Sequence, residues 1–348
     1  MVPEKKEPGL RYIIVLSWLC LLMTLVMPVF CIEPGTAKLP AKEKVSAEMP
    51  PSEATLPIER PIQTTNARDK GRVVRLLEKD GTIQELTMDE YLIRVVAAEM
   101  PASFEPEALK AQACAARTYT VRQQNQPGKH ENADICVDSH CCQAYITPEE
   151  AALRWGLNAA DYTEKITRAV ADTDGLGIVY EGTPIQALFF SSSPGRTTDA
   201  VEVWGNAVDY LKSVESLEGE EVPNYRTQVV LTPQQVKEKM DRAYSGANLS
   251  GAPEGWFTDV RTGESGAVSS LKLGGVTLTG SQVRTLLELR SPAFTIHWDG
   301  NTFVFDVTGY GHGVGMSQYG ANAMARKGES FRAILEWYYS GAEVAFLW

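Results

Sequence analysis

The segment TMDEYLIRVVAAEMPASFEPEALKAQACAARTYTVRQQ, residues 87–124, predicts two consecutive helices. Thr87 and Glu90 have the Thr-x-x-Glu spacing of a capping box, and apolar residues then recur at helical spacing. Pro101 ends the first helix, because the residue before a proline is disfavoured in the α conformation. Pro106 suits the first turn of the second helix, whose many alanines permit close packing against a neighbouring element.

Strands are predicted on both sides of this helical pair. A hairpin is indicated around Lys79-Asp80-Gly81, and a second around Asp299-Gly300-Asn301. Other strands are expected in LGIVYEG (176–182), IQALFFSSS (185–193) and YLKSVES (210–216), and further capped helices at Thr147 and Thr232. Because helices and strands do not alternate as βαβ units, we expect an α+β fold of mixed helices and antiparallel-rich strands that form a cleft.

The N-terminal part of the chain predicts a membrane anchor. Residues 12–32 carry no charge and are long enough to span a bilayer. A cleaved signal peptide would need a small-x-small site after a shorter apolar region, and none is present. The basic residues before the span keep the N-terminus cytoplasmic. We therefore expect a single-pass protein of the cell membrane, with a cytoplasmic tail (1–11), an anchor (12–32), a Pro-rich linker (33–68) and an extracytoplasmic domain (69–348).

The formal net charge of -11 includes no block of Lys and Arg that would follow a phosphate backbone. A nucleic-acid partner is therefore disfavoured.

Glu99 is a candidate general acid. It stands at the predicted C-terminal end of a helix, where the helix dipole disfavours a negative charge, and its neighbours are apolar. Both influences raise the pKa of a carboxyl group, as donation to a glycosidic oxygen requires. The alternative is a surface glutamate at a helix end.

The stretch HENADICVDSHCC, residues 130–142, is a candidate metal site. His130, Cys136, His140 and Cys141 supply two imidazoles and two thiolates, which suffice for a tetrahedral structural zinc. A disulfide is the competing interpretation, because the compartment outside the membrane permits oxidised cysteine. Cys114 and Cys142 remain as surplus thiols.

Two further stretches carry polar groups suited to a cleft. FFSSSPGRTTDAVEVWG, residues 189–205, lacks the Gly-x-Ser-x-Gly of a nucleophile elbow, so a serine hydrolase is disfavoured. In GYGHGVGMSQYGA, residues 309–321, Gly311, Gly313 and Gly315 are expected to let main-chain groups line a groove. His312, Ser317 and Gln318 would then direct donors and acceptors at a sugar. The alternative is a glycine-rich turn.

These blocks resemble the family of stage II sporulation protein D, which also includes the amidase-enhancer LytB proteins. The matching elements, in family order, are EYLIRVVAAEMP, EALKAQACAARTY, SSSPGRTTDAVEVWG with YLKSVES, and GYGHGVGMSQYGA with ILEWYYSGAEV. One departure is Pro194, at a position where the family usually has a Gly-Gly pair.

The resemblance implies a lytic transglycosylase that cuts peptide-stripped peptidoglycan strands between MurNAc and GlcNAc, during septal wall thinning and engulfment. It implies that Glu99 is the acid and base and that His130, Cys136, His140 and Cys141 hold zinc. The expected partners are glycan strands, a cell-wall amidase or endopeptidase and membrane proteins of the engulfment machinery. The residues expected to bind substrate are Lys110, Arg117, Ser191, Ser192, Ser193, Arg196, Tyr310, His312, Ser317 and Gln318.

Two alternatives stay open at this point. A non-enzymatic module that binds glycan and activates a separate amidase would use the same groove. A zinc amidase is disfavoured, because the four metal ligands leave no open position for water and no His-Glu-x-x-His pair is present.

Overall fold

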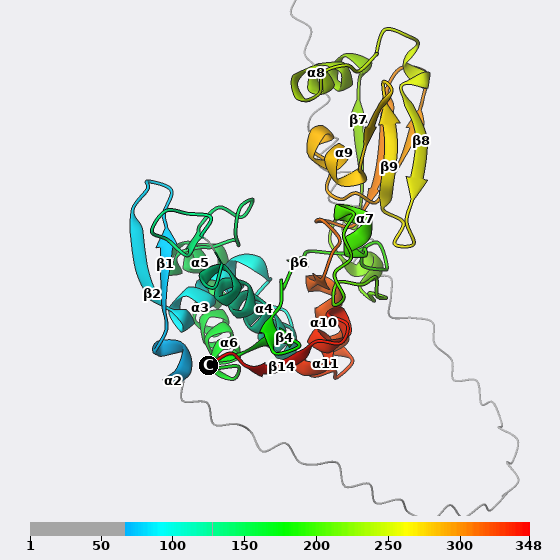
Figure 1. Cartoon of the computed structure of the whole chain (residues 1–348). Coiled ribbons are helices and arrows are strands. Elements are labelled where there is room, and N and C mark those ends of the chain that lie inside the picture. The colour runs from blue at the N-terminus through cyan, green and yellow to red at the C-terminus, as the bar shows by residue number, and fades with distance from the viewer. Residues whose placement is uncertain (1–66, 127) are drawn as a thin grey trace, which may run out of the picture. The chain divides into compact units, whose positions relative to one another are not determined.

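The computed structural model describes residues 67–126 and 128–348, and its largest hydrophobic core surrounds helix α4 (Pro106–Gln124) (Figure 1). Pro106 is the first residue of α4, as its fixed φ suggests. The preceding helix, α3 (Met88–Glu99), begins after the predicted capping box, in which the backbone N–H of Thr87 donates to Glu90 Oε2 at 3.1 Å. Both predicted helices are confirmed.

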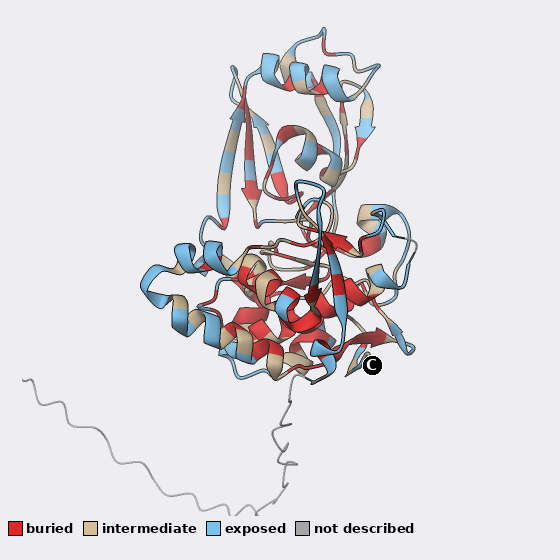
Figure 2. Ribbon diagram, turned by 90° about the vertical axis from the view of Figure 1, so that its left-hand side faces the viewer, coloured by how far each residue is buried: buried red, intermediate tan, exposed pale blue. Residues whose placement is uncertain are grey.

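Four helices pack against α4, since its run of buried alanines lets their backbones approach closely. These helices are α3, α6 (Ala159–Ala171), α10 (Gln318–Arg326) and α11 (Phe331–Tyr338). Ser317 caps α10, and α5 (Pro148–Trp155) begins at the predicted Thr147 cap. Figure 2 shows the buried residues gathered along the inward faces of these helices.

Short sheets complete this part of the molecule. Strands β1 and β2 form the predicted antiparallel hairpin, and β3 pairs parallel to β1. Strand β4 lies between β14 and β5 in antiparallel pairing, whereas β6 and β13 make a short parallel pair. The bounds are β1 Val73–Leu77, β2 Ile83–Thr87, β3 Ile135–Cys136, β4 Leu176–Tyr180, β5 Thr183–Pro184, β6 Phe189–Phe190, β13 Met316–Ser317 and β14 Glu343–Phe346. Helices α2 and α7 span Ala67–Lys70 and Ala200–Trp204.

Residues 226–308 form a second hydrophobic core of their own. Two antiparallel three-stranded sheets, β10-β9-β8 and β11-β12-β7, contribute to it, together with helices α8 and α9 (Figure 1). The bounds are β7 Arg226–Leu231, α8 Pro233–Ala243, β8 Phe257–Thr262, β9 Val268–Leu273, β10 Val276–Leu278, α9 Gly280–Leu287, β11 Phe294–Trp298 and β12 Phe303–Thr308. The hairpin predicted around Asp299-Gly300-Asn301 is the β11–β12 pair. An α+β fold with antiparallel-rich sheets is therefore confirmed.

Two predicted strands are wrong. IQALFFSSS is a strand only at Phe189–Phe190, and YLKSVES contains no strand in the structure. In the second segment, hydroxyl bonds accompany a single backbone bridge between Arg196 and Glu215: Val214 N–H donates to Thr197 Oγ1 at 2.9 Å, and Ser213 Oγ donates to the Thr197 carbonyl at 2.6 Å. Ser and Thr side chains compete with regular backbone pairing in this way.

The predicted membrane anchor (12–32) and most of the linker lie outside the described residues. No helix in residues 67–126 or 128–348 is long and apolar enough to cross a membrane. Asp69, the residue at which the folded domain was predicted to begin, is fully buried and accepts a hydrogen bond from Arg117 of α4.

Candidate functional site

Glu99 is the last residue of α3, and its carboxylate is held by two segments that are distant in the sequence. The backbone N–H of Ala144 donates to Oε1 at 2.7 Å. The side-chain amide of Gln318, at the start of α10, donates to Oε2 at 3.2 Å. The orientation of this carboxyl group is therefore set by the tertiary fold.

Burial raises the pKa of Glu99, and the hydrogen bonds from Ala144 and Gln318 only partly offset the increase. Desolvation disfavours the charged form of a carboxyl group, whereas donated hydrogen bonds favour it. The predicted increase is confirmed, but its main cause is burial by distant segments. The alternative of an ordinary surface glutamate is contradicted.

A cleft extends to both sides of Glu99 as two adjoining pockets of about 570 and 460 Å³. Both are lined by Ala98, Glu99, Ser191 and Gln318. The larger pocket, which we call the α9 side, is also lined by Tyr119, His140, Ala144, Phe190, Arg284, Tyr310 and His312. The smaller pocket, which we call the α5 side, is also lined by Met100, Arg154, Trp155, Tyr162 and Tyr319. An extended ligand would thus pass over Glu99.

The glycines of residues 309–321 serve the packing of the chain against segment 188–198. Gly315 has a φ of +80°, and an added Cβ would overlap the carbonyl oxygen of Leu188. Gly313 has a φ of +85°, and an added Cβ would meet Thr198 Oγ1 at 2.9 Å. Only glycine tolerates such conformations with so little space. The expectation that Gly313 and Gly315 line a groove is therefore wrong, although Gly311 does line the α9 side.

His312 is held by the backbone at both ring nitrogens. Nε2 lies 3.0 Å from the Phe189 carbonyl oxygen, and the backbone N–H of Val314 donates to Nδ1 at 3.2 Å. The ring therefore carries its proton on Nε2 and is neutral. Burial, together with the nearby charge of Arg284, lowers the pKa of His312 to about 4. His312 therefore lines the cleft and, through these two hydrogen bonds, links the backbone at Phe189 to that at Val314.

We expect acid to destabilise the protein through His312. The unfolded histidine binds a proton near pH 6.5 and the folded one only near pH 4, so stability is lost as pH falls through this window. At pH 5 the loss is about 2 kcal/mol, because one pKa unit corresponds to about 1.4 kcal/mol. Urea unfolding at pH 7 and pH 5 should show a smaller difference for His312→Asn than for the parent. The exposed His297→Asn is the matched control; equal pH dependence in all three proteins would contradict the assignment.

Several residues expected to contact substrate are placed elsewhere. Ser192, Ser193 and Ser317 are buried, and a single carboxylate, Glu218, accepts hydrogen bonds from Ser193 N–H and Ser317 Oγ, both at 2.6 Å. Arg196 donates to the Ser213 carbonyl at 3.4 Å and does not line the cleft. Of the three serines at 191–193, only Ser191 lines it.

The two basic residues of α4 that were expected to bind substrate, Lys110 and Arg117, make structural contacts instead. Arg117 is fully buried and forms a salt bridge with Asp69, with Nε donating to Oδ1 at 2.9 Å. Lys110 forms salt bridges with Glu107 at 2.9 Å and Asp172 at 3.2 Å, and it lines a separate cavity between α4 and α6. Neither side chain reaches the cleft beside Glu99.

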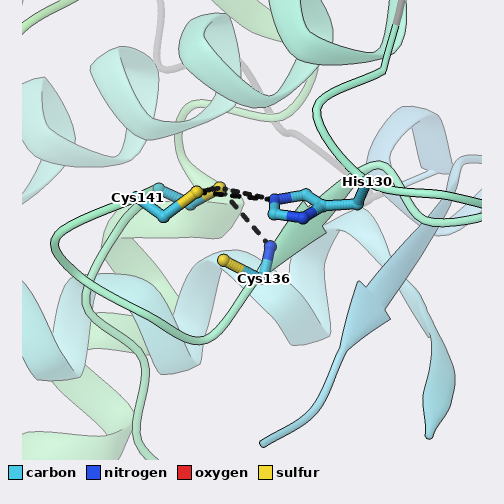
Figure 3. Close-up of side chains that lie close together, drawn as sticks. His130, Cys136 and Cys141 are labelled. Carbon is cyan, nitrogen blue, oxygen red and sulfur yellow. Dashed lines mark hydrogen bonds between the residues drawn. The ribbon is translucent and has the colours of Figure 1, made fainter. Parts of the chain in front are cut away.

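A cluster of His130, Cys136, Cys141 and Cys142 could hold a metal ion, because its ligand atoms all lie within 4.8 Å of one another. Figure 3 shows His130 and Cys141 facing each other in this cluster. Cys142 takes the place predicted for His140, whose side chain is 95% exposed and does not belong to the cluster. In the described part of the chain every cysteine is a free thiol, so the alternative disulfide is absent.

The spacing of three ligands, His130, Cys141 and Cys142, fits a tetrahedral ion. With zinc–sulfur and zinc–nitrogen bonds of about 2.3 and 2.0 Å, ligands at tetrahedral corners lie about 3.5 to 3.8 Å apart. His130 Nε2 lies 3.4 Å from Cys142 Sγ and 3.7 Å from Cys141 Sγ, and the two sulfurs are 3.8 Å apart. The chain then continues directly to Ala144, which holds Glu99.

Sequence reasoning missed Ala144, Arg284, Trp155 and Tyr162 in the cleft. Ala144 acts through its backbone, for which no side-chain pattern exists. Trp155 and Tyr162 pack edge to face at 5.8 Å between ring centroids and look, in sequence, like ordinary helical core residues. Arg284 belongs to α9, far from the recognised motifs.

Comparison with known proteins places these features in a family. The family profile described as SpoIID, stage II sporulation protein, matches residues 78–180. Stage II sporulation protein D of Bacillus subtilis is 35% identical over 337 residues, covering 96% of both chains. The protein of the same name from Bacillus amyloliquefaciens is 38% identical over 266 residues, covering 76% of both. An amidase enhancer of Bacillus subtilis is 27% identical over 298 residues, covering 71% of this chain and 39% of that protein. The chain therefore belongs to the stage II sporulation protein D family.

Proposed function

We propose that this protein is a lytic transglycosylase that cleaves the bond between MurNAc and GlcNAc in peptide-stripped peptidoglycan strands. The observation that carries the proposal is that Glu99 is the only carboxyl group among the described residues lining the cleft. Ordinary glycosidases need two carboxyl groups, one as acid and one as base or nucleophile. A lytic transglycosylase needs one, because the substrate supplies its own nucleophile.

In the proposed reaction, protonated Glu99 donates its proton to the glycosidic oxygen as the bond from the muramyl anomeric carbon to that oxygen breaks. The resulting carboxylate then removes the proton from the muramyl 6-hydroxyl, whose oxygen bonds to the same carbon. The products are a 1,6-anhydromuramyl end and a GlcNAc with a free 4-hydroxyl, and Glu99 is again protonated.

The environment of Glu99 suits both steps. Burial favours the protonated form that starts the reaction, while the donors Ala144 N–H and Gln318 Nε2 stabilise the carboxylate between the two steps. The carboxyl group is also fixed in direction before substrate arrives, as precise proton transfer requires.

Mass spectrometry of products tests this function. Full-length protein incubated with peptide-free glycan strands should release fragments with anhydro ends, which are lighter by one water than hydrolysed ends. Hydrolysed ends would indicate a glycosidase. Binding without any cleavage would favour the other candidate, a glycan-binding activator of an amidase, which the similarity to an amidase enhancer suggests.

We also propose that the His130–Cys136–Cys141–Cys142 cluster holds a structural zinc. One imidazole and three thiolates close a tetrahedral site without a position for water, as in structural sites, which speaks against a zinc amidase. When bound, the ion would stabilise the loop in which the Ala144 N–H donates a hydrogen bond to Glu99.

Chelation is therefore expected to lower both the melting temperature and the rate of glycan cleavage. Elemental analysis should find about one zinc per chain in the parent, and none in Cys142→Ser. His140→Ala is the matched control and should keep its metal, because His140 is exposed and does not belong to the cluster. Loss of metal from His140→Ala, with retention in Cys142→Ser, would restore the ligand set predicted from sequence.

Localisation and partners extend the proposal. We infer a single-pass membrane protein, from the uncharged residues 12–32, whose folded domain acts outside the cytoplasm during engulfment in sporulation. Its expected partners are a cell-wall amidase or endopeptidase that strips stem peptides and membrane proteins of the engulfment machinery.

A further inference from the structure

Arg284 presents a guanidinium without a counter-ion to the α9 side of the cleft. Its Nε donates to the Arg290 carbonyl at 3.1 Å, which leaves both Nη groups available. Within residues 67–126 and 128–348, no carboxylate lies within 4.0 Å of the Arg284 side chain. The side chain nevertheless lines the same pocket as Glu99 and His312.

Because Arg284 is partly buried, the lack of a counter-ion is unfavourable for the folded protein. Burial lowers the pKa of Arg284, and the charge of Arg284 helps to lower the pKa of His312. A second guanidinium, that of Arg290, stacks 4.1 Å from the ring centroid of Tyr310, and its buried Nε has no hydrogen-bond partner. Partly desolvated cations without a counter-ion destabilise a fold unless a ligand supplies the negative charge.

The charge of the cleft is opposite to that of the chain. The protein has a formal net charge of -11, yet the described cleft lining combines Arg284 and Arg154 with a single acidic side chain, Glu99. Such a local excess of positive charge favours an anionic ligand. A neutral sugar chain would not need this excess of positive charge.

We propose that Arg284 binds the lactyl carboxylate of a muramyl residue and thereby selects strands whose stem peptides have been removed. This inference rests on the proposed function for the identity of the ligand. The lactyl group of MurNAc carries a free carboxylate only when no peptide is attached; with the peptide in place it is a neutral amide. The two free Nη groups can hold a carboxylate through paired hydrogen bonds, and an amide cannot replace that interaction.

The test measures glycan binding by full-length Glu99→Gln protein, in which cleavage of the ligand is expected to be about a hundredfold to ten-thousandfold slower. The probes are peptide-free strands, the same strands with lactyl carboxylates converted to methylamides, and strands with stem peptides intact. Hydrogen bonds to charged groups contribute about 1.5–3 kcal/mol, so peptide-free strands should bind roughly ten- to a hundredfold more tightly than methylamide strands.

Adding Arg284→Gln should remove this preference by weakening only the binding of peptide-free strands. Arg242→Gln, an exposed arginine on α8, is the matched control and should leave the preference intact. Equal weakening of both ligands by Arg284→Gln would show a merely structural role and overturn the proposal. Equally tight binding of strands that keep their stem peptides would also overturn the proposal, since Arg284 would then bind a carboxylate of the peptide and not that of the lactyl group.

If the Arg284→Gln substitution prevents folding, the Glu99→Gln protein alone still tests the proposal. Equal binding of peptide-free and methylamide strands by that protein contradicts the proposal. The two proposals also fail differently. Selective binding of peptide-free strands with no cleavage by the wild-type protein would refute the transglycosylase and leave the role of Arg284 standing. Cleavage without preference would refute only the role of Arg284.

Discussion

Replacement of Glu99 by glutamine is expected to lower the rate of glycan cleavage by about a hundredfold to ten-thousandfold, the usual contribution of a general acid and base. Glutamine keeps the shape of the side chain and can still accept the hydrogen bond from Ala144 N–H, but it has no proton of suitable acidity to donate. The rate of appearance of anhydro ends is the measurement. Glu336→Gln, an exposed glutamate on α11, should retain full activity as the matched control.

Glu99→Gln should also be at least as stable as the parent at neutral pH. The pKa of Glu99 is raised in the folded state, so the parent gains stability as pH falls through that raised value toward the unfolded one, and the variant does not. At neutral pH the parent therefore carries the cost of a desolvated charge that glutamine avoids. A Glu99→Gln protein that melts well below the parent, or a folded one that cleaves at the normal rate, would contradict the role of Glu99.

Arg117→Met is expected to lower the free energy of unfolding by about 3–5 kcal/mol, the usual result of removing one partner of a buried salt bridge. Arg117 also donates to the Leu176 carbonyl at 2.7 Å, so the substitution removes this bond and leaves the buried Asp69 carboxylate without its cation. Urea denaturation gives the measurement. Adding Asp69→Asn should recover part of the loss, because the uncompensated charge is then removed.

The matched control for Arg117 lies on the same helix. Arg122 is only half-buried and donates to the Pro184 carbonyl at 3.0 Å, so Arg122→Met should cost no more than about 1.5 kcal/mol. A well-folded Arg117→Met protein with weakened glycan binding would instead support the substrate-binding role that the family resemblance implies.

The elements that follow from local chemistry could be predicted from the sequence. The Thr87–Glu90 capping box, Pro101 and Pro106 place the ends of α3 and α4, and the end of α3 in turn places Glu99. These signals act within a few residues of one another, so they are visible without knowledge of the fold. The predicted strands at 185–193 and 210–216 are wrong; in 210–216, Ser213 and Val214 bond to Thr197, a partner that the local sequence does not show.

The sequence by itself determined the α+β class, the helix boundaries around Glu99, the presence of metal-binding residue types at 130–142 and membership of the family. Only the tertiary structure decided which of these side chains meet. It placed Cys142 and not His140 with the other ligands, buried Arg117 against Asp69, and brought Arg284 of α9 into the cleft beside Glu99. The physical reason is that helix caps and turns depend on neighbours in sequence, whereas burial, charge pairing and the pKa of a carboxyl group depend on neighbours in space.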